Sequence, residues 1–232
     1  YEPFYTEDIV YKTLNFIEEI DSDKIVNLSD ELAIRYTDAG HILLSKQCEV
    51  YINGGSRTRK ILFSSDLGNI ATQDTRIFVE DFKPVSSANI AIMECTYCSK
   101  ERQCTKETYK KDIEKIKSVI EQYCIDNNAR VLIPSFSLDR TPYILWILYS
   151  LFGKDDNFKV PILIDSPLAN RLLDCYSSIL EGDKKELFDE MMSWKNVQRI
   201  IQPENSKAAI ADNGAKIILS SSGMLTAGRS IK

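Results

Sequence analysis

Apolar positions along the chain change from a helical spacing to an alternating one and then to continuous runs. Residues 7–20 repeat apolar side chains every three or four positions, which predicts an amphipathic helix. Residues 26–41 predict two short strands around an acidic turn. Residues 47–66 alternate apolar and polar side chains around a two-glycine turn, which is typical of a β-hairpin. Residues 88–97 predict a buried strand that carries an acidic side chain near its end.

The pattern after residue 100 alternates helices with strongly apolar strands. Helices are predicted at 104–127, 141–152, 168–180 and 184–194, and strands at 129–136, 160–167 and 215–225. This alternation predicts an α/β fold with a parallel sheet covered on both faces. The change in composition near residue 100 predicts one domain over residues 1–98 and a second over residues 99–232.

The composition is that of a globular protein, with 44% hydrophobic and 27% charged residues. No run reaches the roughly 18 consecutive apolar residues of a membrane helix, so no membrane partner is expected. The first residues lack the basic and apolar regions of a signal peptide. The six cysteines lack the spacing of a disulfide framework, which predicts reduced thiols and a cytoplasmic protein. A net charge of −5 argues against non-specific coating of a polyanion but not against a local phosphate site.

Polar side chains follow several of the predicted strands. They are His41, Asp66, Glu94, Ser135, Asp165 and the run Ser220, Ser221, Ser222 and Gly223. In open α/β sheets, ligands bind beyond the carboxyl ends of the strands, and imidazole and carboxylate are ligands that zinc prefers. From the residues alone two interpretations stay open: a ligand site, or polar residues that end strands and cap turns.

Six segments make the chain similar to a known family. In order they are YTDAGHILLS, ILFSSDLG, IMECTY, VLIPSFSLDRTPYIL, ILIDSPLA and IILSSSGMLTAGR. Together they resemble the β-CASP branch of the metallo-β-lactamase superfamily, over essentially the whole chain. The resemblance implies a partial metallo-β-lactamase αββα domain over residues 1–98 and an inserted β-CASP parallel α/β domain over residues 99–232. It also implies a zinc-dependent hydrolase of RNA processing that cleaves phosphodiester bonds in single-stranded RNA or, as an open alternative, DNA.

The resemblance also implies roles for individual residues. His41 and Asp66 would be metal ligands, with Asp66 bridging two zinc ions about 3.5–4 Å apart. Glu94 would act beside Asp66 in catalysis by orienting a histidine, as a carboxylate behind an imidazole does. The hydroxyl and N–H groups of Ser220, Ser221, Ser222 and Gly223, with Ser135 and Ser137, would bind phosphate. A plain turn is the alternative for these serines.

The sequence departs from the family at several positions. Leu44, Ser65, Cys98 and Asp139 stand where the family commonly has glycine. Glycine marks a left-handed or closely approached backbone, so we expect the local backbone to differ there. The His-x-His-x-Asp-His cluster of the family is absent, because the sequence begins after that point. With one histidine, the chain is expected to lack a complete two-zinc site and to be inactive by itself.

Several alternatives accompany this prediction. The departures at Leu44, Ser65 and Cys98 leave a catalytically silent β-CASP scaffold or RNA-binding subunit as the alternative, and retention of both His41 and Asp66 argues against it. A lactamase-fold hydrolase of small molecules is disfavoured by the segments after residue 100. Endonucleolytic and exonucleolytic cleavage both stay open.

Three smaller predictions concern cysteines, a helix cap and assembly. Cys95, Cys98 and Cys104 hint at a separate structural zinc site, with incidental thiols as the alternative. Asp165 is predicted to cap the helix that begins at Pro167. Exposed apolar sheet surface would favour a homo-oligomer.

Overall fold

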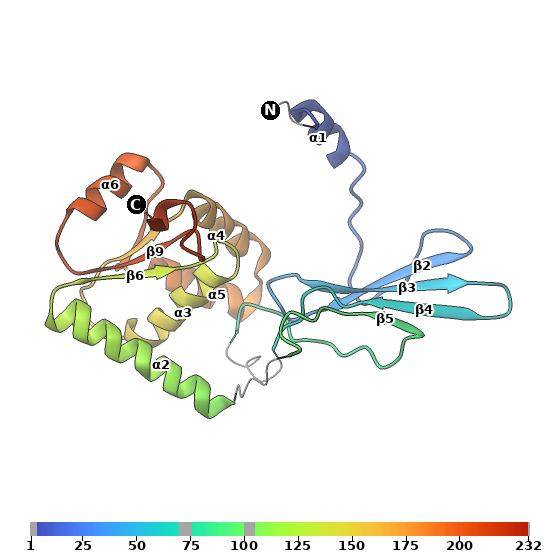
Figure 1. The fold of residues 1–232 in the computed structure, drawn as a ribbon, viewed down its shortest axis with the longest axis horizontal. Coiled ribbons are helices and arrows are strands. Elements are labelled where there is room, and N and C mark those ends of the chain that lie inside the picture. Colours follow the sequence, from blue (N-terminus) through green and yellow to red (C-terminus); the bar gives the residue numbers. More distant parts are fainter. Residues whose placement is uncertain (1–3, 70–75, 100–104, 232) are drawn as a thin grey trace. The chain divides into compact units, whose positions relative to one another are not determined.

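The computed structural model describes residues 4–69, 76–99 and 105–231, and the chain divides into two compact units (Figure 1). Unit 1 comprises residues 1–39, 45–67 and 83–96, and unit 2 comprises residues 40–44, 68–82 and 97–232. Both units are discontinuous, whereas the sequence pattern predicts two continuous domains. The division at residue 98 stays a prediction.

Unit 1 contains a mixed sheet whose strands follow one another in the order β1-β2-β3-β4-β5. Its elements are α1 (Glu7–Leu14), β1 (Val26–Asn27), β2 (Leu32–Asp38), β3 (Lys46–Asn53), β4 (Thr58–Phe63) and β5 (Ile90–Ile92). Strands β1 to β4 pair antiparallel, and β5 joins β4 in parallel. The predicted hairpin is confirmed as β3–β4. The helix predicted over residues 7–20 ends already at Leu14.

One face of this sheet is apolar. Strand pairing places Ile34, Val50, Ile61 and Ile90 in one row across it. Ile90 and Ile92 of β5 are exposed there. The prediction that residues 88–97 form a buried strand is therefore wrong in its burial, because β5 is the edge strand of the sheet and all three of its residues are exposed. The apolar run predicts the strand itself correctly.

The opposite face of the sheet is polar and carries a buried carboxylate. Arg35 donates from Nε to Glu49 Oε1 at 2.7 Å and from Nη2 to Oε2 at 3.0 Å. Lys60 Nζ and the Tyr51 hydroxyl also donate to Oε2, at 2.8 and 3.0 Å. Burial alone would raise the pKa of Glu49, but these donors outweigh burial and hold the pKa below its usual value.

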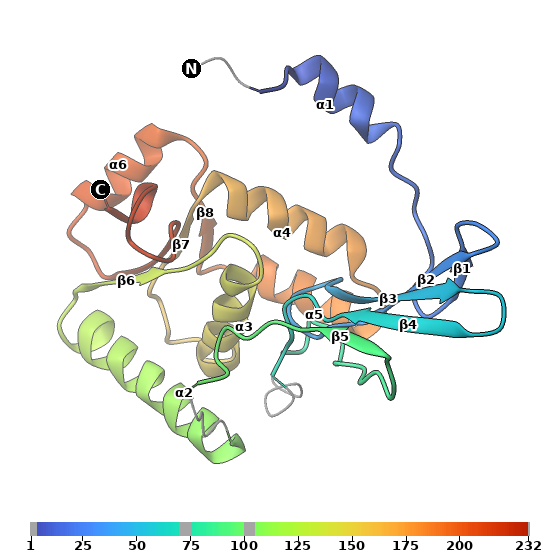
Figure 2. The same ribbon diagram turned by 45° about the vertical axis from the view of Figure 1, so that its right-hand side comes forward.

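Unit 2 contains a parallel sheet in the order β6-β9-β7-β8 (Figure 2). Its elements are α2 (Lys106–Ile120) with a π-helical extension (Glu121–Asp126), β6 (Arg130–Pro134), α3 (Arg140–Phe152), β7 (Ile162–Asp165), α4 (Pro167–Ile179), α5 (Gly182–Ser193), β8 (Val197–Arg199), α6 (Pro203–Ala211), β9 (Lys216–Ser220) and a short 3₁₀ helix (Arg229–Ile231). The predicted α/β fold, with its parallel sheet and alternating helices, is confirmed.

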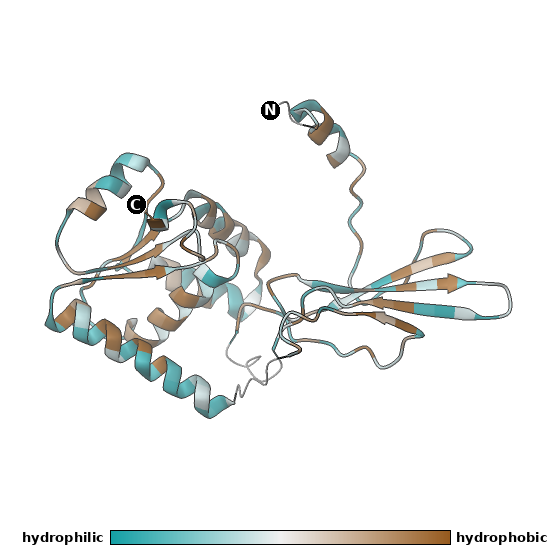
Figure 3. Ribbon diagram, in the orientation of Figure 1, coloured by the Kyte–Doolittle hydropathy of each residue, from teal (hydrophilic) through white to brown (hydrophobic). Residues whose placement is uncertain are grey.

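The core of unit 2 lies on one face of the parallel sheet. Ile162 and Ile164 of β7 and Ile217 and Leu219 of β9 are buried there against side chains of α2, α3, α4 and α5. In Figure 3, α2 presents both apolar and polar residues along its length, as the sequence pattern predicts.

The second face of the parallel sheet is only partly covered. Helix α6 lies on this side, opposite α2 and α3 (Figures 1 and 2). Lys216 Nζ is buried there and donates to the carbonyls of Ala209 and Asp212 near the end of α6, where a helix attracts cations. Leu132 of β6, on the same side, is 45% exposed. The predicted coverage of both faces therefore holds in part.

A segment that lies far from the helices in sequence completes the core of unit 2. Phe78 packs edge-on against Trp146 and Phe188, with ring centroids 5.8 and 5.2 Å apart. Arg76 forms an ion pair with Asp139, which precedes α3. Both side chains of the pair are almost wholly buried. These contacts hold residues 76–79 against α3 and α5.

Within the described part of the chain, no helix is both long enough and apolar enough to cross a membrane.

Protonation of Glu49 should contribute to acid unfolding. Its native pKa lies below the unfolded value of about 4.3, so its stabilising effect is present above that pH and is lost as the pH falls through the native pKa. Urea unfolding should show that Glu49→Gln is less stable than the unaltered chain near pH 6, with a smaller difference near about pH 3. Glu31→Gln, in an exposed turn, is the control and should leave the pH dependence unchanged. An equal difference at both pH values would contradict this role.

Helix α4 offers a matched pair for the core. Leu173 is 0% exposed and Leu168 is 54% exposed in the same helix. Leu173→Ala should lower the free energy of unfolding by about 2–5 kcal/mol, because it removes buried methyl groups and leaves a cavity. Leu168→Ala should change it by about 0.5 kcal/mol or less. Equal losses in urea unfolding would show that α4 does not pack as described.

Candidate active site

Two segments of unit 2 meet at the glycines beside His41. Gly40 has φ +66°, and a Cβ there would lie 2.9 Å from the amide nitrogen of Phe82. A Cβ at Gly68 would lie 1.8 Å from the carbonyl oxygen of Gly40. The two backbones therefore touch in a way that only glycine permits. Both glycines and Phe82 belong to unit 2, so this contact fixes the backbone beside His41 within that unit.

Glu94 lies beside the Asp66 loop, at the ends of the adjacent parallel strands β4 and β5. The backbone N–H of Leu67 donates to Glu94 Oε1 at 2.7 Å. The Glu94 N–H donates to Ser64 Oγ at 3.1 Å, and the Ser64 N–H donates to the carbonyl of Ile92 at 3.0 Å. The structure thus places the Glu94 carboxylate against the residue that follows Asp66.

The side chains in the described ranges do not form a complete metal site. No group of three or more histidine, cysteine, aspartate or glutamate side chains in these ranges lies as a metal would require. A zinc site uses at least three protein ligands, and the resemblance assigns only His41 and Asp66 in this sequence. These residues by themselves do not fit the zinc cluster that the resemblance implies.

Three positions where the family commonly has glycine have a left-handed backbone. Leu44, Ser65 and Asp139 have φ angles of +63°, +48° and +63°. The expected change of backbone at these positions is therefore not found, because each residue adopts a conformation that glycine adopts without strain. Ser65 Oγ also donates to the carbonyl of Lys46 at 2.8 Å, which holds the Asp66 loop to the start of β3.

The predicted phosphate-binding serines gather at the carboxyl ends of β6 and β9. Ser135 shares a hydrogen bond of 3.1 Å with Thr141, and the Ser135 N–H donates to the carbonyl of Ser220 at 2.9 Å. Ser137 and Ser221 each contact the hydroxyl of Ser166 at 3.1 Å. These hydroxyls therefore bind one another.

Burial separates this set into two groups. Ser135, Ser137 and Ser220 are buried, whereas Ser221, Ser222 and Gly223 are only half-buried. The half-buried run is the part of the set that a phosphate could reach. A phosphate-binding role for the whole set stays a prediction.

The predicted capping role of Asp165 is wrong. The cap of α4 is Ser166, whose Oγ accepts from the N–H of Ala169 at 3.2 Å. Asp165 instead accepts from Arg229 Nη1 at 2.6 Å and from Ser206 Oγ at 2.7 Å. Sequence reasoning missed this arginine because it lies 64 positions from its partner.

The cysteines give no support for a second metal site. Cys48, Cys95, Cys98, Cys124 and Cys175 are free thiols among the described residues, and Cys95 and Cys98 are exposed. Cys104, the third member of the predicted zinc site, lies outside the described residues.

Leu44 should be strained by its left-handed backbone. Leu44→Gly should raise the free energy of unfolding by about 0.5–1 kcal/mol, because the relief of strain exceeds the entropy that glycine adds to the unfolded chain. Leu28 is similarly exposed but is not among the positions with positive φ, so Leu28→Gly should lower the same quantity by about 0.5–1 kcal/mol. Urea unfolding measures both. The same sign for both variants would mean that Leu44 bears no strain.

Comparison with known proteins agrees with the predicted family. Residues 141–232 match the Beta-Casp domain family. The chain is 27% identical to a protein named Ribonuclease TTHA0252 from Thermus thermophilus, over 98% of this chain and 51% of the relative. It is 27% identical to cleavage and polyadenylation specificity factor subunit 3-I of Arabidopsis thaliana, over 97% of this chain and 31% of the relative. It is 22% identical to transcription termination factor FttA of Methanosarcina mazei, over 97% of this chain and 35% of the relative.

Residues 141–232 carry the match to the Beta-Casp domain family, and over nearly its whole length the chain is similar to these relatives, as the resemblance to the β-CASP branch of the metallo-β-lactamase superfamily implies. It spans about half the length, or less, of these curated relatives.

Proposed function

We propose that this chain is part of a hydrolase that cleaves phosphodiester bonds in single-stranded RNA. The observation that carries the proposal is the similarity over 98% of the chain to a protein named a ribonuclease. The contact of the Leu67 N–H with Glu94 Oε1 adds support, because it places Glu94 beside the residue that follows Asp66 within unit 1.

The proposal includes zinc, whose complete site needs more ligands than the two that the resemblance assigns in this sequence. Imidazole and carboxylate are zinc ligands, so His41 and Asp66 would each supply one, with Asp66 between two ions. Glu94 would orient a histidine of the complete site. The chain has one histidine, so the other ligands would come from outside this sequence. By itself the chain then binds zinc weakly and leaves RNA uncut.

RNA would bind at the carboxyl ends of β6 and β9. The N–H and hydroxyl groups of Ser221, Ser222 and Gly223 would contact phosphate. The buried hydroxyls of Ser135, Ser137 and Ser220 would hold the surrounding loops in place.

The proposal extends to location, assembly and domains. Free thiols at the described cysteines suit the reducing cytoplasm. The apolar face at Ile90 and Ile92 suits self-association. The two domains of the resemblance would cover residues 1–98 and 99–232.

A catalytically silent RNA-binding subunit is the second candidate. It is suggested by Leu44, Ser65 and Cys98, which stand where the family commonly has glycine, and retention of His41 and Asp66 argues against it. Zinc content separates the two candidates, because the hydrolase needs a filled site and the silent subunit does not.

The test measures zinc content and RNA cleavage in the full-length gene product. We expect about two zinc ions per chain, as in a two-metal site, and metal-dependent cleavage of single-stranded RNA. Asp66→Ala should reduce both, because it removes the bridging carboxylate. Asp30→Ala, an exposed aspartate in the turn before β2, is the control and should change neither. Absence of zinc and of cleavage in the unaltered protein would favour the silent subunit.

The 232-residue chain is tested in parallel. It should show no cleavage under the same conditions. Robust metal-dependent cleavage by this chain, abolished by Asp66→Ala, would contradict the proposed dependence on further ligands.

A further inference from the structure

In the segment that follows β6, the usual relation between polarity and burial is reversed from one residue to the next. The buried side chains are polar and the exposed ones are apolar or cationic: Ser135, Ser137 and Asp139 are buried, and Phe136, Leu138 and Arg140 are exposed. Folding normally buries apolar side chains and leaves polar ones in water. The exposed apolar and cationic side chains of this segment therefore form a candidate binding surface.

The buried half of the segment fixes its backbone. Ser135 bonds to the Thr141 hydroxyl and Ser137 to the Ser166 hydroxyl, each at 3.1 Å. Asp139 forms its buried ion pair with Arg76. The Thr141 N–H also donates to the carbonyl of Phe136 at 3.2 Å, which closes the turn. The exposed side chains consequently project from a well-anchored base.

Phe136 stands against the turn that follows β9 and still faces solvent. A Cβ at Gly223 would lie 3.0 Å from the Phe136 amide nitrogen and 3.1 Å from its ring. Phe136 is nevertheless 52% exposed, and the neighbouring Met224 is 69% exposed. An aromatic ring supported along one edge in this way offers a surface for stacking.

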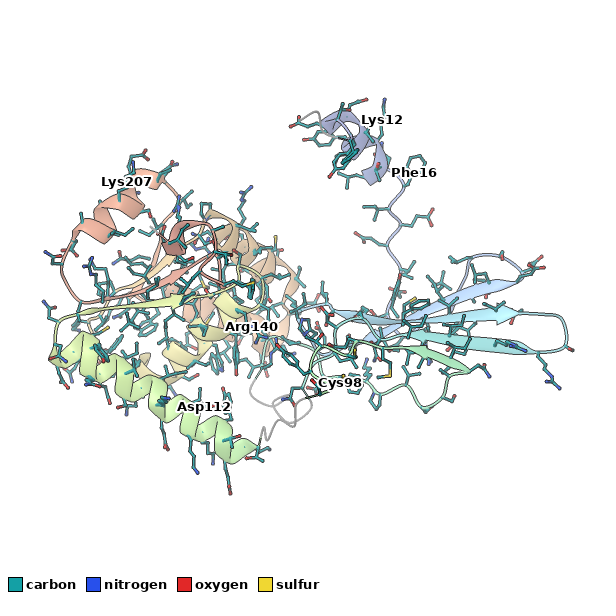
Figure 4. The ribbon with its side chains drawn as sticks, in the orientation of Figure 1. Lys12, Phe16, Cys98, Asp112, Arg140 and Lys207 are labelled. Carbon is teal, nitrogen blue, oxygen red and sulfur yellow. The ribbon has the colours of Figure 1, made fainter. Side chains whose placement is uncertain are left out.

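Arg140 adds a cation to the same turn. It begins α3, where Figure 4 labels it. Its Nε lies 3.9 Å from Asp139 Oδ2, a carboxylate that Arg76 already neutralises. A guanidinium has five N–H donors, so Arg140 keeps donors for a phosphate.

We propose that Phe136 stacks on an unpaired base of single-stranded RNA and that Arg140 binds a phosphate of the same strand. The inference rests on the proposed function, since it names a subsite for that RNA. Ligands of open α/β sheets bind at the carboxyl ends of the strands, where both residues lie. Single-stranded nucleic acid is bound by this combination of an aromatic ring and a cation. A purely apolar partner would make no use of the arginine.

The test measures binding of a fluorescein-labelled oligouridylate to the 232-residue chain by fluorescence anisotropy. Phe136→Ala should weaken binding about 5- to 150-fold, the range for loss of one stacked base. Phe136→Trp should restore binding, because a larger ring stacks as well. Phe16→Ala is the control, since Phe16 is 84% exposed in unit 1 and should not contribute. An abasic oligonucleotide of equal length should bind the Phe136→Ala and unaltered chains equally.

The contribution of Arg140 is measured by the salt dependence of binding and by the abasic oligonucleotide. Arg140→Ala should weaken oligouridylate and abasic binding alike. It should reduce the slope of log affinity against log salt by about 0.7, as expected for one lost phosphate contact to a single strand. Urea unfolding of each variant should match that of the unaltered chain, because both side chains are exposed.

The outcomes separate this inference from the proposed function. RNA binding by the unaltered chain that is indifferent to Phe136 and Arg140 would overturn the inference alone. Absence of RNA binding by the unaltered chain would overturn the inference and remove support from the proposed function. Loss of self-association in Phe136→Ala, with RNA affinity unchanged, would assign the surface to a protein contact and overturn the inference.

Discussion

The burial of Phe78, held by the ion pair between Arg76 and Asp139, is the interaction on which the packing of unit 2 around the start of α3 depends. The pair is almost wholly removed from water, so loss of either partner would leave an uncompensated charge at a cost of about 3–5 kcal/mol. The anchored ring fixes residues 76–79 to α3 and α5 within unit 2. The Asp139 end of the pair also fixes the start of α3 and the turn before it.

Local periodicity predicts the elements of this fold well and their burial less well. Strands β7 and β9 are apolar runs that lie in the core, as the sequence pattern predicts. Strands β5 and β6 have similar runs, but β5 is exposed and β6 is at most half-buried. An apolar run predicts a strand that is stabilised by burial. The helices or strands that cover it are remote in sequence. For this reason the order of strands and helices follows from the pattern, and the coverage of each face does not.

In the candidate site, too, the sequence identifies individual positions but not the contacts that they make with remote residues. The resemblance identifies the positions of Leu44 and Ser65 as glycine sites, but only the structure shows that these side chains keep the left-handed backbone. The sign of φ at such residues is decided by the surrounding contacts, which local sequence does not report. The pairing of Asp165 with Arg229 is equally invisible, because ion pairs across 64 positions leave no periodic signal. Proximity to Pro167 suggested a helix cap, and the neighbouring serine performs that role instead.

The turn after β6 reverses the usual relation between polarity and burial, which only the structure shows. A continuous apolar strand gives way at Ser135 to an alternation in which polar side chains are buried and apolar ones are exposed. Leaving a phenylalanine in water forgoes about 1.5–3 kcal/mol of burial free energy, and buried hydroxyls stabilise only when each is bonded. Here the hydroxyls of Ser135 and Ser137 are hydrogen-bonded, and the side chain of Phe136 is exposed. Such an arrangement loses stability but holds the ring in one place before any ligand arrives, which reduces the entropy that binding must overcome.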